Sequence, residues 1–462
     1  MKLYNIEIDV KNKPVLDQDF IPLYKFNQGF LKDATKPFKI ALEGKGGQIY
    51  VFDTFVREGK EYKEANQYYV ERMVKAILWC VGGYKLTLCG DKELGEYIKT
   101  VYSSTGMRAF DYKAMSVIYE KEFSVDCREF KEAPKPFKTP KAIGRNLDGC
   151  RIGFDAGGSD RKVSAVINGK SVFSEEVVWH PKVQSDPSYH YNGIVAALKR
   201  AAKEMPRVDA IGISSAGIYI DNRTMIASLF KKVPEEEFNQ YVKDIYIRAG
   251  KEIGDVPLEV CNDGDVTALA GAMSLEDTKI LGIAMGTSEA GGYVDENGNV
   301  LGWLNELAFI PCDAQDNASL DEWSGDIGCG VKYFSQDGVI KLAPKLGIEL
   351  DESLSPGNKL KQIQEMRDEE GYKGGIEKIY QTIGAYLGHT LAYYSTFYDI
   401  KHVLLMGRVT SGEGGEIIVN VANHVLRDEY PQLADRISLQ LPDEKSRRVG
   451  QSVAAASLPT IE

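Results

Sequence analysis

The sequence predicts an α/β protein with two similar halves, preceded by a small α+β domain. The main observation is a layout that occurs twice, in RIGFDAGGSDRKVSAVING and in ILGIAMGTSEAGGYVDENGN: a strand, a glycine turn with a hydroxyl, a second strand and a hairpin turn. Between the two copies, helix and strand patterns alternate, which is typical of a parallel or mixed sheet with crossover helices. The chain of 462 residues is also too long for one core, so two or three domains are expected.

The composition is that of an ordinary globular protein, with 43% hydrophobic and 27% charged residues. Residues 1–145 carry a net charge of +5 and the remainder carries −16, which argues against a nucleic-acid partner. The seven cysteines include no CxxC pair, so neither a disulfide framework nor a zinc knuckle is indicated. No signal-peptide pattern precedes the strand KLYNIEIDV, and no apolar run approaches the roughly 20 residues of a membrane span. These observations predict a cytoplasmic protein.

Residues 1–132 are expected to form an accessory α+β domain, to which the sequence assigns no role. Strand patterns cover residues 3–10, 38–42, 48–55, 85–89 and 115–123, and helix patterns cover residues 61–81 and 91–103. The turn GKGG joins the second and third strands. It lacks the following helix and the Lys-Ser/Thr pair of a P-loop, so a hairpin turn is favoured over a phosphate loop. No three-helix pattern precedes this hairpin, which argues against a DNA-reading head.

A linker follows the accessory domain. The segment EAPKPFKTPK, residues 132–141, has three prolines among ten residues, with lysines beside them. This composition is typical of an extended, semi-rigid connection. We therefore place the linker at residues 133–145, a first lobe at residues 146–262 and a second lobe at residues 263–444.

The first glycine turn, AGGSD, follows a strand of residues 152–155. Gly157 and Gly158 let the backbone approach a phosphate closely, and Asp155 at the strand end can hold Mg²⁺ through water. The alternative is a plain type I′ or II′ turn. Further strands are expected at residues 162–167, 172–178 and 208–214, with a helix at residues 191–204.

The central segment LEVCNDGDVTALAGA, residues 258–272, reads as a buried strand, a turn and a helix rich in small residues. This pattern places the Asp263 carboxylate where a strand ends and a helix begins. Backbone N–H groups and the positive end of the helix are expected to favour its ionised form, so that it can act as a base. The alternative is that Asp263 only caps the helix.

The second glycine turn is Gly286-Thr287-Ser288, between strands of residues 280–285 and 291–295. It lies about 130 residues after the first turn and likewise offers backbone N–H groups and hydroxyls. Two such turns suit a duplicated fold that holds a polyphosphate between two lobes.

Five segments in this order resemble motifs of the ROK family, in the sugar kinase/actin/Hsp70 superfamily. GFDAGGSD and AMGTSEAGGYVDENGNVLG resemble the two phosphate motifs, DAIGISSAG and CNDGDVTALAGA the sugar-contacting segments, and LLMGRVTSG the adenosine segment. The terminal VGQSVAAAS resembles the closing helix, about residues 445–462, which packs back on the first lobe. The resemblance covers about residues 151–462. It implies a duplicated, ribonuclease H-like two-lobe fold of the actin/hexokinase type.

The resemblance also implies the roles of individual residues. Asp263 corresponds to the general base, and the sugar contacts correspond to Asn262, Glu306, Ala216 and Gly217. Mg²⁺ would be held through water by Asp155. The residues implied for ATP binding are Gly157, Gly158, Ser159, Gly286, Thr287, Ser288 and Gly407.

The chain departs from the family pattern at the zinc site. The family's Glu-x-Gly-His appears as Glu306-Leu307-Ala308-Phe309, so Phe309 replaces a histidine that contacts the sugar and binds zinc. The Cys-rich zinc loop retains only Cys329, and we therefore predict no zinc. His180 and His190 have no carboxylate or cysteine partner at metal spacing and are interpreted as surface residues.

The first hypothesis is an ATP-dependent sugar kinase that phosphorylates a hydroxyl of a hexose or an N-acetylated amino sugar, with ATP and Mg²⁺ as cofactors. The resemblance implies a homodimer. The alternative is a catalytically weak or inactive sugar-binding regulator of the same family, motivated by Phe309 and by Arg408, which replaces a usual glycine. Asp263 and both glycine turns favour the kinase, because a sensor does not need the base.

Overall fold

The computed structural model describes residues 1–138, 143–367, 369, 371–442 and 444–461, with only the backbone at residues 444–449. The chain forms two compact units, each assembled from three segments. Unit 1 comprises Met1–Pro140, Ile283–Gly291 and Trp303–Leu441. Unit 2 comprises Lys141–Gly282, Gly292–Gly302 and Pro442–Glu462. The boundaries expected at residues 132 and 262 do not coincide with this division.

Unit 2 is built on a five-stranded mixed sheet with strand order β13-β10-β7-β8-β9. The strands β7, β10 and β13 are parallel, and β8 and β9 add antiparallel to the β7 edge. Because the three parallel strands are in register, Asp155, Ser214 and Cys261 lie side by side near their carboxyl ends. The strand bounds are Cys150–Ala156 (β7), Asp160–Ile167 (β8), Lys170–Val178 (β9), Ala210–Ser215 (β10) and Leu258–Asn262 (β13).

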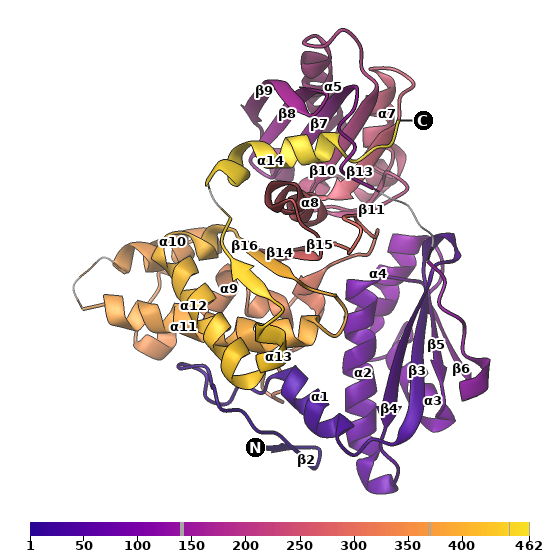
Figure 1. Ribbon diagram of the computed structural model, residues 1–462, viewed down its shortest axis with the longest axis vertical. Helices are drawn as coiled ribbons and strands as arrows, with labels where there is room; N and C mark the ends of the chain where they lie inside the picture. The colour runs from indigo at the N-terminus through magenta and orange to yellow at the C-terminus, as the bar shows by residue number, and fades with distance from the viewer. Residues whose placement is uncertain (139–142, 368, 370, 443, 462) are drawn as a thin grey trace. The chain divides into compact units, whose positions relative to one another are not determined.

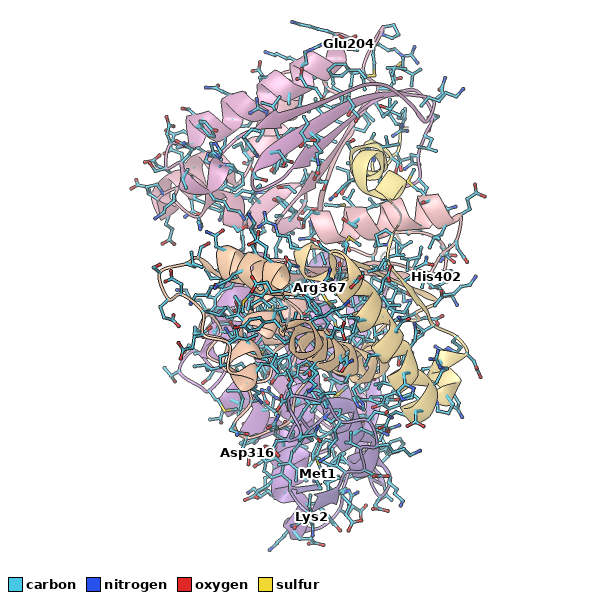
Figure 2. All side chains as sticks on the ribbon, turned by 90° about the vertical axis from the view of Figure 1, so that its left-hand side faces the viewer. Met1, Lys2, Glu204, Asp316, Arg367 and His402 are labelled. Atoms are coloured by element: carbon cyan, nitrogen blue, oxygen red, sulfur yellow. The ribbon has the colours of Figure 1, made fainter. Side chains whose placement is uncertain are left out.

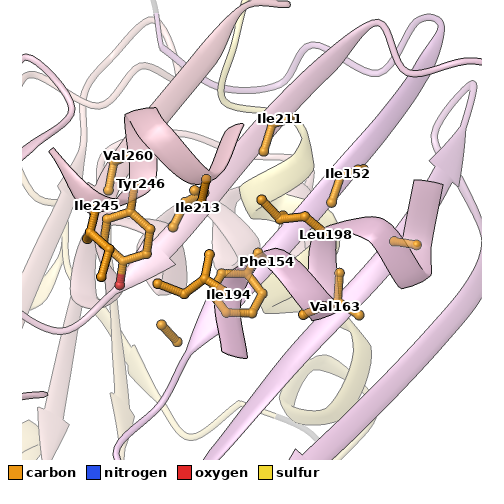
Figure 3. Close-up of a cluster of buried hydrophobic side chains, with 14 of the residues drawn as sticks. Ile152, Phe154, Val163, Ile194, Leu198, Ile211, Ile213, Ile245, Tyr246 and Val260 are labelled. Carbon is orange, nitrogen blue, oxygen red and sulfur yellow. The ribbon is translucent and has the colours of Figure 1, made fainter. Parts of the chain in front are cut away.

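One face of this sheet carries the hydrophobic core of unit 2. Phe154 and Ile213 from the sheet meet Ile194 and Leu198 of α5 and Tyr246 of α7, and all five are almost fully buried (Figure 3). The burial of these apolar faces is the main term that stabilises the sheet. The helices of unit 2 are α5 (Pro187–Ala202), α6 (Glu235–Glu237), α7 (Ile245–Lys251), α8 (Asp263–Leu275) and α14 (Glu444–Ala456).

The opposite face of the sheet is covered by α14, which also packs on α8 (Figure 1). Glycines on β7 and β10 make this close contact possible. A Cβ at Gly153 would lie 1.7 Å from the carbonyl oxygen of Ser452, and one at Gly212 would lie 1.6 Å from that of Ala455. Only glycine therefore fits at these two positions. The hairpin β11 (Ile218–Ile220) and β12 (Arg223–Ile226) completes unit 2.

Unit 1 contains an N-terminal sheet with strand order β4-β3-β5-β6, beside the helix α2 (Figure 1). The turn GKGG joins β3 and β4 as an antiparallel hairpin, which confirms that prediction. The strands are Lys36–Glu43 (β3), Ile49–Val56 (β4), Lys85–Cys89 (β5) and Ser124–Arg128 (β6). The helices are Leu23–Leu31 (α1), Lys63–Cys80 (α2), Lys92–Val101 (α3) and Ala109–Tyr119 (α4).

A second sheet, of order β15-β14-β16-β17, belongs largely to unit 1. Its strands are Ile280–Met285 (β14), Glu289–Val294 (β15), His402–Met406 (β16) and Ser438–Gln440 (β17). Arg367, labelled in Figure 2, follows α10 and lies 3.8 Å from the Glu413 carboxylate at the start of α12. The helices are Gln336–Ile340 (α9), Pro356–Met366 (α10), Lys373–Tyr394 (α11), Glu413–Glu429 (α12) and Pro431–Ala434 (α13).

The N-terminal segment is joined to the rest of unit 1 by buried contacts. Arg72 of α2 forms an ion pair with Asp326 at 3.1 Å, and both side chains are almost fully buried. His389 of α11 contacts the carbonyl oxygen of Asn12 at 2.9 Å. These contacts explain why residues 1–132 group with residues 303–441 instead of forming a unit of their own.

Two of the expected strands are wrong. Residues 3–10 form a two-residue hairpin, β1 (Lys2–Leu3) and β2 (Ile6–Glu7), because Tyr4 and Asn5 adopt positive φ angles and turn the chain. Residues 115–123 mostly belong to helix α4, which ends at Glu120 in the left-handed conformation (φ 50°). The predicted linker lies partly outside the described residues. In the part of the chain that the structure describes, every helix is too short or too polar to cross a membrane.

Candidate functional site

The predicted site residues fall into two groups, one in each unit. The group in unit 2 lies where the parallel strands β7, β10 and β13 end. It brings together the first glycine turn and the segment around Asp263, which are far apart in the sequence. Its members are Asp155, Gly157, Gly158, Ser159, Ala216, Gly217, Asn262 and Asp263.

Trp179, at the end of β9, holds the first glycine turn in place. Its indole Nε1 donates hydrogen bonds to the carbonyl oxygens of Gly157 and Asp160 at 2.8 and 3.1 Å, and its backbone N–H donates to that of Ser159 at 3.1 Å. The Ser159 hydroxyl is exposed and donates to the Asp160 carboxylate at 3.1 Å. The turn is thus fixed through three carbonyl oxygens by the indole and the backbone N–H of one residue, Trp179.

Asp155 occupies the end of β7, beside Ser214 of β10. The Ser214 hydroxyl donates to Asp155 Oδ1 at 2.8 Å and accepts a hydrogen bond from Gln451 Nε2 at 3.2 Å. Burial raises the pKa of Asp155 to about 6, although the Ser214 hydrogen bond opposes the increase; the negative charge of Asp263 adds to it. A divalent cation beside Asp155 would relieve the cost of holding two carboxylates in this environment.

Asp263 is the first residue of α8, but the residue that caps the N-terminus of this helix is Asn262. Asn262 Oδ1 accepts a hydrogen bond from the Gly264 N–H at 2.7 Å, so the capping role considered for Asp263 falls mainly to Asn262. The expected effect of the backbone N–H groups is present, since they lower the pKa of Asp263, but burial outweighs it. Burial raises the pKa of the Asp263 carboxyl, against the opposing Gly264 N–H and the Lys182 ammonium.

Asn262 also fixes the second predicted sugar segment. Its Nδ2 donates to the carbonyl oxygen of Gly217 at 2.7 Å, and Gly217 has a φ of 139° that favours glycine. The Ala216 carbonyl oxygen accepts a hydrogen bond from the Tyr219 hydroxyl at 3.1 Å. One N–H and one lone pair of the Asn262 amide remain for a ligand.

The second group lies in unit 1, at the ends of β14 and β16. Gly286, Thr287 and Ser288 form the turn after β14, and the Gly286 carbonyl oxygen accepts from the Gln336 N–H at 2.8 Å. Gly407 follows β16, and a Cβ on it would lie 2.4 Å from the carbonyl oxygen of Met285. The structure therefore brings Gly407 beside this turn. Thr287 and Ser288 are exposed.

Glu306 and Phe309 lie on a separate segment of unit 1. The Glu306 N–H donates to the Trp79 carbonyl oxygen at 2.9 Å. The Phe309 ring is buried against Trp79, Phe110 and Trp323, with centroid distances of 4.2, 5.7 and 5.3 Å. The residue that replaces the expected histidine thus belongs to an aromatic cluster.

Buried ion pairs hold the loop that contains Asp326 and Cys329. The Asp326 carboxylate contacts Arg108 at 2.6 Å, Arg72 at 3.1 Å and Lys75 at 3.7 Å. Cys329 is buried, with its Sγ 3.6 Å from Asp326 Oδ2. Among the described residues, no three His, Cys, Asp or Glu side chains gather closely enough to hold a metal ion.

The prediction for one histidine is wrong, and one lysine near the site was not predicted. His180 is exposed as expected, but His190 is fully buried in α5, where its Nε2 lies 3.0 Å from the Pro181 carbonyl oxygen. Lys182 was not singled out, because 24 residues separate it from Gly158. The Lys182 side chain nevertheless reaches the first glycine turn.

Of the comparisons with known proteins, only the one with solved structures gives matches. No family model matches the sequence, and no curated protein matches it. Among solved structures, a ROK hexokinase from Thermus thermophilus has 17% identity and a TM-score of 0.51, covering 67% of this chain and 97% of its own. A ROK family transcriptional regulator, a homologue of the E. coli MLC protein, has 16% identity and a TM-score of 0.50, covering 68% and 79%.

Identities this low show likeness of fold alone. They confirm the expected resemblance to the ROK family in fold, over about two thirds of the chain. One of these two neighbours is a hexokinase and the other a regulator, so the fold by itself does not select between catalysis and sensing.

Proposed function

We propose that this protein is an ATP-dependent sugar kinase that transfers the γ-phosphoryl group of ATP to a hydroxyl of a hexose or N-acetylated amino sugar. The observation that carries the proposal is the arrangement in unit 2. A carboxylate at the start of α8 and a glycine turn held by Trp179 lie at the ends of parallel strands that form one sheet. Ligands of open α/β sheets bind beyond these strand ends.

In the proposed reaction, Asp263 is the catalytic residue. The sugar hydroxyl oxygen forms a bond to the γ-phosphorus, its proton passes to the Asp263 carboxylate, and the bond to the β–γ bridging oxygen breaks to release ADP. A pKa raised by burial makes the ionised Asp263 carboxylate a stronger base. The Gly264 N–H, 3.1 Å from Asp263 Oδ1, orients the carboxylate.

The remaining roles follow the sequence-based assignment. Asn262 and Glu306 orient sugar hydroxyls, with Ala216 and Gly217 beside them. The phosphates and adenosine are bound by Gly157, Gly158, Ser159, Gly286, Thr287, Ser288 and Gly407. Asp155 would hold Mg²⁺ through water, and the ion would neutralise charge on the phosphate oxygens; the proposal includes no zinc.

We also propose a duplicated, ribonuclease H-like architecture for the two sheets. In unit 2, the order β13-β10-β7-β8-β9 places the antiparallel pair on one side of the first strand and the parallel strands on the other. In the second sheet, β15 and β16 flank β14 in the same way. The resemblance further suggests a cytoplasmic homodimer, which gel filtration with light scattering tests.

A sugar-binding regulator is the second candidate, and Phe309 favours it. The Phe309 ring is packed among Trp79, Phe110 and Trp323, so it offers no hydrogen bond where the resembling kinases use a histidine. A regulator would bind sugar without transferring phosphate.

The test measures ADP release from ATP and Mg²⁺ with a panel of hexoses and N-acetylated amino sugars. Asp263→Asn should reduce turnover with the accepted sugar by at least about 10³-fold while sugar-induced thermal stabilisation persists. Asp255→Asn, the same chemical change at an exposed position of unit 2, should keep full turnover.

Near-normal turnover of Asp263→Asn would overturn the assignment of the base. No turnover with any sugar, together with sugar-induced stabilisation, would instead favour the regulator.

A further inference from the structure

The segment Trp179–Val183, which we term the strap, links the first glycine turn to helix α5. Trp179 donates three hydrogen bonds to carbonyl oxygens of the turn, as described above. Next to Trp179, the buried His190 of α5 contacts the Pro181 carbonyl oxygen at 3.0 Å, and the Tyr189 hydroxyl accepts from the His180 N–H at 3.0 Å. These contacts hold residues 179–181 of the strap, and Lys182 follows them directly.

The Lys182 side chain lies directly over the turn. Its Nζ and Cε are each 2.8 Å from the position that a Cβ of residue 158 would occupy. The absence of a side chain at Gly158 thus leaves room for the end of Lys182. Since residues 179–181 are held just before Lys182, the ammonium is placed beside Gly158 of the turn.

The ammonium of Lys182 has no partner of its own. Among the described residues, no hydrogen bond or ion pair involving its Nζ is found, although its charge acts on Asp263. The other cations near the turn are engaged elsewhere. The Arg161 guanidinium lies 5.6 Å from the centre of the Trp179 ring, and Lys162 contacts Asp160 and Glu176 at 3.8 and 3.7 Å.

The negative charges around the turn make a cation necessary for a polyphosphate. Asp155, Asp160 and Asp263 all lie on the segments that form this end of the sheet, and they repel an anionic ligand. The glycine turn itself offers only neutral N–H donors. A lysine ammonium is a compact charge on a flexible stem that suits a phosphate oxygen.

We propose that Lys182 binds a phosphate oxygen of the nucleoside triphosphate held by the first glycine turn. This inference rests on the proposed function and adds a residue for which neither the sequence motifs nor the family resemblance supplied a role. Lys182 would offset the repulsion from the nearby carboxylates and hold the triphosphate against the turn. The strap, through Trp179 and His190, positions it for that contact.

The test measures binding of ATP, adenosine and inorganic tripolyphosphate by calorimetry, in the presence of Mg²⁺ and without sugar. Lys182→Met keeps the aliphatic stem and removes the charge, and it should weaken ATP and tripolyphosphate binding by about 10- to 100-fold. Adenosine binding should stay unchanged. Lys182→Arg should retain ATP binding within a few-fold, and Lys232→Met, at an exposed position of unit 2, should match the wild type.

The outcomes separate this inference from the proposed function. If Lys182→Met binds ATP as tightly as the wild type, Lys182 has no phosphate role, whatever the turnover. If ATP and adenosine binding weaken equally in Lys182→Met, the residue is structural and the inference is overturned. If the wild type binds ATP with the expected loss in Lys182→Met but phosphorylates no sugar, the inference stands and the kinase proposal fails. If the wild type binds neither ATP nor tripolyphosphate, both fail.

Discussion

Glu289, the first residue of β15, is a buried carboxyl group whose replacement by glutamine should change how stability depends on pH. Its side chain is 2% exposed; Oε1 accepts a hydrogen bond from the Tyr394 hydroxyl at 3.1 Å, and Oε2 has no hydrogen-bond partner. Oε2 faces the backbone of Gly330, where a Cβ would lie only 2.2 Å away. The thiol of Cys312 is the other titratable group that interacts with Glu289. Burial raises the pKa of Glu289 to about 8, against the Tyr394 hydrogen bond.

The direction of the pH effect follows from the two protonation states. The folded protein keeps the Glu289 proton up to about pH 8, whereas the unfolded chain loses it near the ordinary value of 4.5. Stability is therefore highest below pH 4.5 with respect to this group, falls as the pH rises to 8, and is constant above. Each pH unit in that window costs about 1.4 kcal/mol, so the wild type loses on the order of 3 kcal/mol at pH 7 and about 5 kcal/mol above pH 8.

The measurement is urea denaturation of the wild type and Glu289→Gln at several pH values from 5 to 8.5. Glutamine has nearly the same shape but no proton to lose, so its stability relative to the wild type should rise by several kcal/mol across this range. A constant offset from the new amide does not affect that slope. Glu349→Gln, at an exposed position of unit 1, should show no such trend. A difference between Glu289→Gln and wild type that is flat with pH would refute the reasoning.

Three further substitutions test packing and charge. Gly153→Ala should cost about 3 kcal/mol or more in urea denaturation, because its Cβ would lie 1.7 Å from the Ser452 carbonyl oxygen; a cost under about 1 kcal/mol would contradict this packing. Asp326→Asn should cost about 3–5 kcal/mol at both low and high salt, because the buried cations Arg72 and Arg108 then share Glu71 as their one remaining carboxylate partner among the described residues. Phe309→Ala should cost about 3–5 kcal/mol and change the tryptophan fluorescence, because the ring packs on two tryptophans; an unchanged spectrum would count against the aromatic cluster.

The matched control for the buried charge is an exposed carboxylate of the same unit. Glu352→Gln removes a carboxylate whose side chain is 92% exposed and which lies 2.8 Å from the Lys359 ammonium. Its cost should be below about 1 kcal/mol, since solvent screens exposed pairs. Similar losses for Asp326→Asn and Glu352→Gln would show that burial does not govern the energetics of the cluster.

The bounds of a helix or strand were predicted correctly where the hydrophobic pattern and the flanking turn residues indicate the same element. Strands β5 and β14 have the predicted bounds, because each is a short apolar run enclosed by turn residues. The run from Met115 to Phe123 was predicted as a strand, but most of it belongs to a helix. Val117, Ile118 and Tyr119 favour a strand by composition, but the helix α4 buries Ala114, Met115 and Ile118 on one face.

The candidate site was predictable where the chemistry is local in sequence. The turn at Asn262 and the glycines after β7 and β14 could be located from the residues alone. Their environment could not: the pKa of Asp263 is raised because other segments bury it, and Lys182 approaches Gly158 only after β8 and β9 bring the chain back. The buried ion pairs of Asp326 join residues about 250 positions apart, which no spacing rule indicates.

The helix α14 has a consequence for the order in which the protein is made. It covers the face of β7 and β10 at Gly153 and Gly212, yet its residues are synthesised about 300 positions after Gly153. At a translation rate of about 5–20 residues per second, α14 is synthesised roughly 15–60 seconds after the strand that it covers. During this time the chain is still attached to the ribosome, and the sheet face that α14 later covers is exposed. Polar groups on this side of the sheet gain their final partners only when the last helix emerges: the Ser164 hydroxyl, for example, lies 2.7 Å from the Ser452 hydroxyl of α14.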